Sequence, residues 1–264
     1  IQRMRKLGGM ISDELLISKD QVELSASICK VDLISDLVGE FPELQGIMGG
    51  YFALEQGFDK EIALALSEHY LPSGLDSKTP KKPFSIALAL TDKIDTLAGF
   101  FGINQKPTSS KDPYALRRSA LGIIKLLIDN NKEFKIKDLI SYSTSLHRDQ
   151  GFELSNNLSQ KELAEFLMDR LKYFMKEKKI RTDIVDASIS LYGIDYINKI
   201  YKKALTLNNL INKEIGEDVI ATYKRASNIL ESELKNNNLE LSNTTDPGIF
   251  KNDYEKNLLK KINE

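Results

Sequence analysis

The sequence predicts an all-α protein. From residue 61 onward, apolar residues recur at spacings of three and four, which places them on one face of a helix. The clearest run is Ile86, Leu90, Ile94, Leu97 and Phe101. Similar runs occupy residues 163–174 and 219–230, and no comparable strand alternation is present. An all-helical fold is therefore expected.

Capping residues and prolines predict where helices begin and end. Asp112 followed by Pro113 predicts a helix start, because aspartate accepts hydrogen bonds from free backbone amides and proline suits the first helical position. Ser159 and Glu162 have the spacing of a capping box ahead of the helix expected at residues 163–174. The segment Leu71–Pro83 contains three of the seven prolines, so a loop between two helices is predicted there.

The stretch Glu40–Gly57 is rich in glycine. Pro42 and an acidic first turn predict a helix, and the closely spaced Gly46, Gly49 and Gly50 would let another backbone approach it. These glycines do not follow a predicted strand, so a phosphate-binding loop is a poor interpretation. The residues alone predict close helix packing.

Composition limits the class of protein. The 37 lysines and arginines are balanced by 38 acidic residues, so nucleic-acid binding would require a local basic patch. Cys29 is the only cysteine, which excludes an internal disulfide and a zinc site with several thiolates and favours a cytoplasmic location. The most apolar stretch, residues 84–103, contains Asp92, Lys93 and Asp95, which are too costly for a lone membrane span. We expect a soluble protein.

Four basic residues surround the predicted helix start at Asp112: Lys106, Lys111, Arg117 and Arg118. Free amides and the helix dipole favour a phosphate at such a position. Arg117 and Arg118 point about 100° apart on a helix. We therefore expect at most one of them to face RNA, while the other pairs with Asp92, Asp95 or another carboxylate.

Several sequence blocks resemble the beta subunit of bacterial two-subunit glycyl-tRNA synthetase. The two most distinctive are LVGEFPELQGIMGGYFALEQG (37–57) and KPTSSKDPYALRRSALG (106–122). Four further blocks follow the family order: SEHYLP (67–72), ALTDKIDTLAGFFGI (89–103), EFLMDRLKYFMKEKKIRTDIVDAS (165–188) and YKRASNIL (223–230). The chain departs from the family pattern in the loop at residues 108–110, at Tyr114 in place of phenylalanine, and at Lys179 in place of glycine.

The resemblance implies a fold in three parts. Residues 1–130 would form a helical domain like that of HD-type phosphohydrolases, residues 131–158 a connecting helix, and residues 159–264 a helical body with an incomplete anticodon-binding-like domain. Because the chain begins at Ile1 and stops at Glu264 in a helical pattern, we expect a fragment of a longer subunit.

An HD-type metal site requires an adjacent His-Asp pair, which this chain lacks. Its two histidines are His69, followed by Tyr70, and His147, followed by Arg148. We therefore expect no metal and no catalytic residue in this chain, and His69 is expected to be a packed or hydrogen-bonded side chain. A metal phosphohydrolase and a non-catalytic helical scaffold from a split gene are the alternatives.

By resemblance, the chain is a tRNA-binding part of glycine-tRNA ligase. Glycylation, with ATP and magnesium, would occur on a separate alpha subunit, and the partners would be that subunit and glycine tRNA, in a complex of two alpha and two beta subunits. No cofactor and no membrane contact are expected for this chain. The candidate tRNA contacts of the second half are Lys176, Lys179, Arg181, Lys224 and Arg225.

Overall fold

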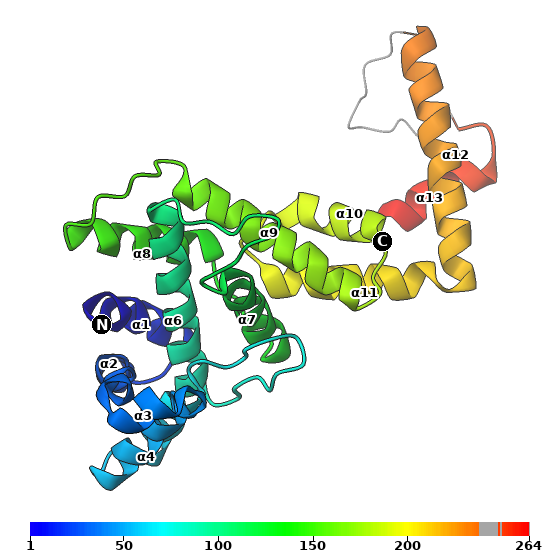
Figure 1. The fold of residues 1–264 in the computed structure, drawn as a ribbon. Helices are drawn as coiled ribbons and strands as arrows, with labels where there is room; N and C mark the ends of the chain where they lie inside the picture. Colours follow the sequence, from blue (N-terminus) through cyan, green and yellow to red (C-terminus); the bar gives the residue numbers. More distant parts are fainter. Residues whose placement is uncertain (238–247, 249, 264) are drawn as a thin grey trace. The chain divides into compact units, whose positions relative to one another are not determined.

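A computed structural model describes residues 1–237, 248 and 250–263 (Figure 1). This part of the chain contains thirteen α-helices and two short 3₁₀-helices, and it contains no strand. The all-α prediction is confirmed. No helix in the described ranges combines the length and the apolar character needed to cross a membrane.

The chain forms two compact units, Ile1–Asn209 and Leu210–Glu264. The division into parts ending at residues 130 and 158 stays a prediction. The helices before residue 83 are α1 (Gln2–Leu15), α2 (Lys19–Ile28), η1 (Val31–Ile34), α3 (Asp36–Glu40), η2 (Pro42–Leu44), α4 (Ile47–Glu55) and α5 (Lys60–Glu68). The later ones are α6 (Pro83–Gly102), α7 (Leu116–Asp129), α8 (Ile136–Asp149), α9 (Ser159–Glu177), α10 (Thr182–Tyr192), α11 (Ile197–Ile211), α12 (Glu214–Asn237) and α13 (Asp253–Asn263).

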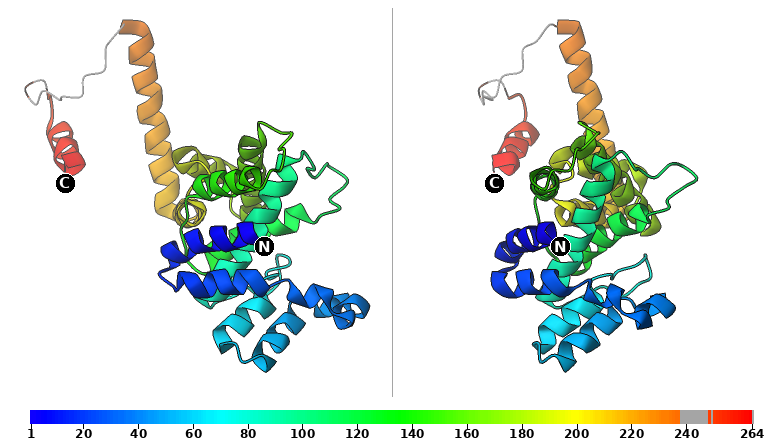
Figure 2. Two further views of the ribbon diagram at one scale, coloured as in Figure 1. Left: turned by 90° about the vertical axis from the view of Figure 1, so that its left-hand side faces the viewer. Right: turned by 60° about the vertical axis from the view of Figure 1, so that its left-hand side comes forward.

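Helix α6 is the centre of the first unit. It packs against α1, α2, α5, α7, α8 and α9, and most of its residues are buried on every side. Figures 1 and 2 show it surrounded by these helices, with α1 and α2 lying side by side. A helix that is buried all round must also bury its polar residues, and α6 carries three charges.

The predicted loop at Leu71–Pro83 is confirmed. It joins α5 to α6, and Pro83 is the first residue of α6, where its missing N–H leaves no hydrogen bond unmade.

Two predicted helix starts require correction. Asp112 does accept hydrogen bonds from the amides of Leu116 and Arg117, at 2.9 and 3.0 Å, but a turn separates it from α7, which begins at Leu116. Ser159 is buried and does not cap α9. The Glu162 carboxylate instead binds Lys106, so it is not available to close a capping box.

The close packing predicted for the glycine-rich stretch is confirmed. Within it, η2 begins at Pro42 and α4 begins at Ile47, so the stretch forms two short helices. Gly46 separates them with a φ of 82°, in the left-handed region that favours glycine. On α4, a Cβ at Gly50 would lie 2.7 Å from the carbonyl oxygen of Ala63 on α5, so only glycine allows this approach.

We predict that Gly50→Ala destabilises the protein by roughly 1–3 kcal/mol, because its Cβ would meet Ser67 Oγ at 1.9 Å and a backbone oxygen that cannot rotate away. Urea unfolding measures the change. The control is Gly39→Ala on α3, where no atom lies within 4 Å of the new Cβ. Equal stability of the two variants would contradict the packing account.

Candidate functional site

The first charge of α6, Asp92, pairs with Lys30 from the end of α2. Their charged atoms lie 2.7 Å apart. Burial works against the Lys30 ammonium, but Asp92 and Tyr70 outweigh it and raise its pKa. The same ammonium lies 3.9 Å from the centre of the Tyr70 ring, a cation–π arrangement.

His69 is fully buried next to this ion pair. Its Nδ1 lies 2.6 Å from the carbonyl oxygen of Leu66, and its Nε2 lies 3.1 Å from Lys30 Nζ. An Nδ1–H tautomer satisfies both contacts, because it donates to the carbonyl and accepts from the ammonium. Burial and the nearby Lys30 charge lower the pKa of His69 to about 4, so the ring is neutral near pH 7. The expectation of a hydrogen-bonded structural histidine is confirmed.

The second charge, Lys93, ends in a ring of backbone oxygens. Its Nζ donates to the carbonyls of His69, Tyr70 and Leu71 at 3.2, 3.2 and 3.0 Å. Burial lowers the pKa of Lys93 to about 8. On the other side, Gly122 of α7 makes room for this side chain, since a Cβ there would lie 2.6 Å from Lys93 Cε. Lys93 therefore fixes the start of the loop that follows α5.

The third charge, Asp95, binds side chains from α1 and α8, which are far apart in the sequence. Arg3 Nε and a second guanidinium nitrogen donate to its two oxygens at 2.9 and 3.1 Å, and His147 Nε2 lies 3.2 Å from Oδ1. Burial opposes ionisation, but the hydrogen bonds from His147 and Arg3 outweigh it and lower the pKa of Asp95. This network joins α1, α6 and α8.

Neither histidine is arranged as a metal ligand. Both His69 nitrogens are already in hydrogen-bonding contacts, and His147 Nε2 binds Asp95. Within the described ranges, no three His, Cys, Asp or Glu residues cluster closely enough to hold an ion. The residues present therefore do not fit the metal of an HD-type hydrolase.

A cleft of about 710 Å³ opens beside these networks. Four blocks that are separate in sequence meet there: the 37–57 block, the 67–72 block with the loop after it, the 89–103 block and the 106–122 block. The lining residues are Pro42, Glu43, Gln45, Tyr70, Pro72, Ser73, Asp92, Lys93, Tyr114, Ala115, Arg118 and Ser119. The cleft is our candidate functional site.

The helix start next to the cleft is not a free anion site. The Asp112 carboxylate already accepts from the first amides of α7, and the Arg117 guanidinium donates to the carbonyl oxygen of Thr108 and lies 4.0 Å from Asp112. One arginine of the pair thus does serve a structural carboxylate, which is Asp112 and neither Asp92 nor Asp95. The guanidinium of Arg118 is exposed at the cleft and has no partner among the described residues.

The other candidate contacts divide into paired and unpaired cations. Lys106 pairs with Glu162 at 2.8 Å and Arg181 with Asp183 at 2.7 Å. Within the described part of the chain, the candidates that are exposed and have no ion-pair partner are Lys111, Lys176, Lys179, Lys224 and Arg225. Lys224 and Arg225 lie on α12 in the second unit, whereas the cleft belongs to the first unit.

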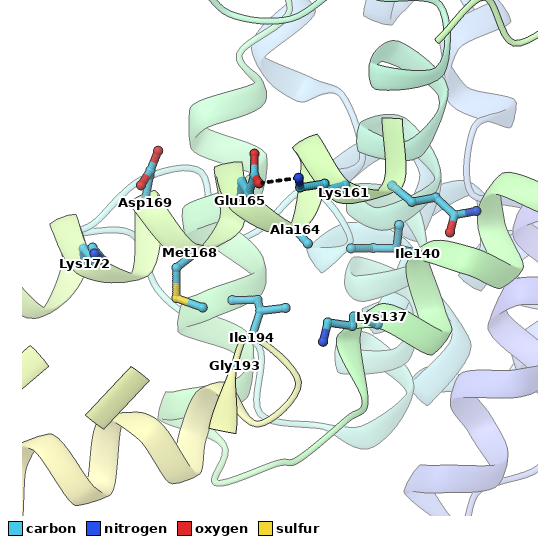
Figure 3. Close-up of a pocket in the computed structure, with 11 residues that line it drawn as sticks. Lys137, Ile140, Lys161, Ala164, Glu165, Met168, Asp169, Lys172, Gly193 and Ile194 are labelled. Carbon is cyan, nitrogen blue, oxygen red and sulfur yellow. Dashed lines mark ion pairs between the residues drawn. The ribbon is translucent and has the colours of Figure 1, made fainter. Parts of the chain in front are cut away.

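A second groove, of about 550 Å³, lies between α8, α9 and the turn after α10 (Figure 3). Apolar side chains such as Ile140, Met168 and Ile194 line it. The lysines at this groove are each paired with a carboxylate: Lys137 with Asp195, Lys161 with Glu165 and Lys172 with Asp186. Because its lysines are neutralised and its floor is apolar, this groove is less suited to binding a polyanion than the first cleft is.

Comparisons with known proteins agree with the sequence blocks. A family model described as glycyl-tRNA synthetase beta subunit matches residues 1–190. The glycine–tRNA ligase beta subunits of a Ruegeria species and of Cereibacter sphaeroides are both 39% identical to this chain, over 92% and 98% of its length. That of Paracoccus denitrificans is 38% identical over the whole chain.

These matches place the chain among aminoacyl-tRNA synthetase subunits. Within that class it belongs to the glycyl-tRNA synthetase beta subunit family, as the resemblance predicted. The chain spans 34% to 37% of the length of the three relatives.

Sequence reasoning did not predict the cleft. Tyr70, Lys93 and Tyr114 belong to recognised blocks, but spacing along the chain does not reveal that the blocks share one cavity. The available signal was the placing of charges in the apolar stretch 84–103, which predicts that other segments converge on α6 to neutralise them.

Lys179, where the family favours glycine, has a φ of 59°. Its amide donates to Lys176 O at 2.9 Å, and the Ile180 amide donates to Met175 O at 3.1 Å, which is the Schellman pattern that ends a helix. Glycine suits this left-handed position because it lacks a Cβ. A side chain here is strained.

We predict that Lys179→Gly raises the free energy of unfolding by roughly 1 kcal/mol, because it relieves the left-handed strain. The urea midpoint reports the gain. Lys178→Gly is the matched control: this residue has a φ of −81°, so glycine relieves nothing there. A Lys179→Gly variant no more stable than the wild type would contradict the assignment.

Proposed function

We propose that this chain is the tRNA-binding part of a glycine-tRNA ligase beta subunit. It would bind glycine tRNA in the cytoplasm and support glycylation by a separate alpha subunit, which would use ATP with magnesium, in a complex of two alpha and two beta subunits. The observation that carries the proposal is the family match over residues 1–190, together with relatives 39% identical over nearly the whole chain.

The distribution of charge supports a role in binding a polyanion. Net charge is −1, so attraction to RNA must come from local groups. The unpaired cations among the candidates are Lys111, Arg118, Lys176, Lys179, Lys224 and Arg225, and each is exposed where it can reach a phosphate. Lys106, Arg117 and Arg181 serve internal contacts and become secondary candidates.

The alternative of a metal phosphohydrolase receives no support from the site. The histidines that would bind the metal are engaged with Leu66, Lys30 and Asp95. A non-catalytic scaffold differs from the proposed function by one property, which is binding to glycine tRNA.

We expect the 264-residue chain to retain glycine tRNA in a filter-binding titration, with an affinity that falls as salt rises because bound phosphates release counterions. The double variant Lys224→Gln/Arg225→Gln should bind more weakly, and the slope of log affinity against log salt should fall by roughly 1 to 2. The control is Lys60→Gln/Arg148→Gln, which removes two exposed cations that are not candidates.

Absent or salt-independent binding by the wild-type chain would contradict the proposed function. An equal loss of affinity in the control pair would show that the loss comes from the reduced positive charge of the whole chain. Lys224 and Arg225 would then no longer be assigned to the tRNA interface.

A further inference from the structure

The cleft beside α6 offers an aromatic platform on one wall. Tyr114 stacks on Phe100 of α6, with ring centres 4.2 Å apart and planes inclined by 25°. The Tyr114 side chain nevertheless keeps 46% of its surface exposed. A ring held on one face and open elsewhere is preorganised to stack with a second planar group.

A free guanidinium from the first turn of α7 lines the same cleft as that ring. Arg118 lines the same cleft, is exposed, and has no hydrogen-bond or ion-pair partner among the described residues. Its neighbour Arg117 and the α7 amides are occupied by Thr108 and Asp112, so they are not available to an anion. Lys111 is also exposed near this helix start, but Arg118 is the free cation that lines the cleft. A guanidinium is well suited to a phosphate.

The segment after Pro42 supplies hydrogen-bonding groups to the lining of the cleft. Glu43 is exposed there without an ion-pair partner in the described chain, and Gln45 lies beside it. The Tyr70 hydroxyl is buried close to Lys30 and Gln45 but makes no hydrogen bond of normal geometry.

We propose that the cleft binds one unpaired nucleotide of RNA, with its base stacked on Tyr114, its phosphate on Arg118, and its base edge facing Glu43 and Gln45. An aromatic face, a cation and hydrogen-bonding groups together are what recognition of a splayed single-stranded base requires. The volume of about 710 Å³ falls in the range of ordinary ligand pockets. This site rests on the proposed tRNA-binding function and specifies an unpaired nucleotide, and not a duplex, as the element that enters the cleft.

The test uses the full chain and a short single-stranded oligoribonucleotide that carries one 2-aminopurine, whose emission falls when its ring stacks. We expect the wild type to bind it and quench its emission. Tyr114→Leu should abolish the quenching and weaken binding roughly tenfold. Arg118→Gln should weaken binding and lower the salt slope by roughly 1.

The matched controls are Tyr51→Leu and Arg148→Gln, which alter an exposed tyrosine on α4 and an exposed arginine on α8 outside the cleft. Both should behave as the wild type. Failure of the wild type to quench the probe, or quenching that survives Tyr114→Leu, would overturn the proposed site. Displacement by inorganic phosphate in wild type and Tyr114→Leu alike would show an anion site and would also overturn it.

Glycine tRNA measured in parallel separates this site from the proposed function. If tRNA binds the wild type, Tyr114→Leu and Arg118→Gln equally, the cleft assignment fails and the tRNA-binding function stands. If the oligoribonucleotide shows Tyr114-dependent quenching while tRNA does not bind, the nucleotide site stands and the tRNA function fails.

Discussion

The first unit is built around the need to neutralise three charges inside one buried helix. Helix α6 carries Lys93 and Asp95, which are buried, and Asp92, which is largely buried, and an isolated buried charge would be strongly unfavourable. Each charge binds a different part of the chain. Asp92 pairs with Lys30, Lys93 donates to the backbone carbonyls that follow α5, and Asp95 binds Arg3 and His147. These contacts are specific in direction, so they fix where α1, α2, α5 and α8 lie around α6 in a way that apolar packing alone would not.

The same contacts shape the cleft. Lys93 binds carbonyl oxygens at the start of the loop after α5. Asp92 holds the Lys30 ammonium near the ring of Tyr70. Tyr70, Asp92 and Lys93 all line the cleft, so the charge network forms part of its wall. Another part of the wall comes from the segment before α7, where Asp112 accepts hydrogen bonds from the first amides of α7 and Tyr114 packs on Phe100. An opening with polar walls beside the charge network is suited to recognition.

Much of the fold could be predicted from the sequence, and the cleft could not. Helical periodicity, the proline-rich loop and the glycine packing of α4 are local properties, and the structure confirms them. The capping box at Ser159 failed because Glu162 binds Lys106, 56 residues away, and short-range spacing cannot register such a competitor. The different roles of Arg117 and Arg118 were predicted from their directions on a helix, whereas the partners of Arg117, Asp112 and Thr108, were not.

A double-mutant cycle on Lys30 and Asp92 tests most directly whether neutralisation of α6 organises this unit. Lys30→Met and Asp92→Leu should each lower the free energy of unfolding by roughly 2–4 kcal/mol, because each leaves a largely buried charge unpaired. The double variant should lose less than the sum of the two, with a coupling of roughly 2 kcal/mol or more, since it removes both charges. Additive losses in urea unfolding would show that the two charges act independently and would contradict the account.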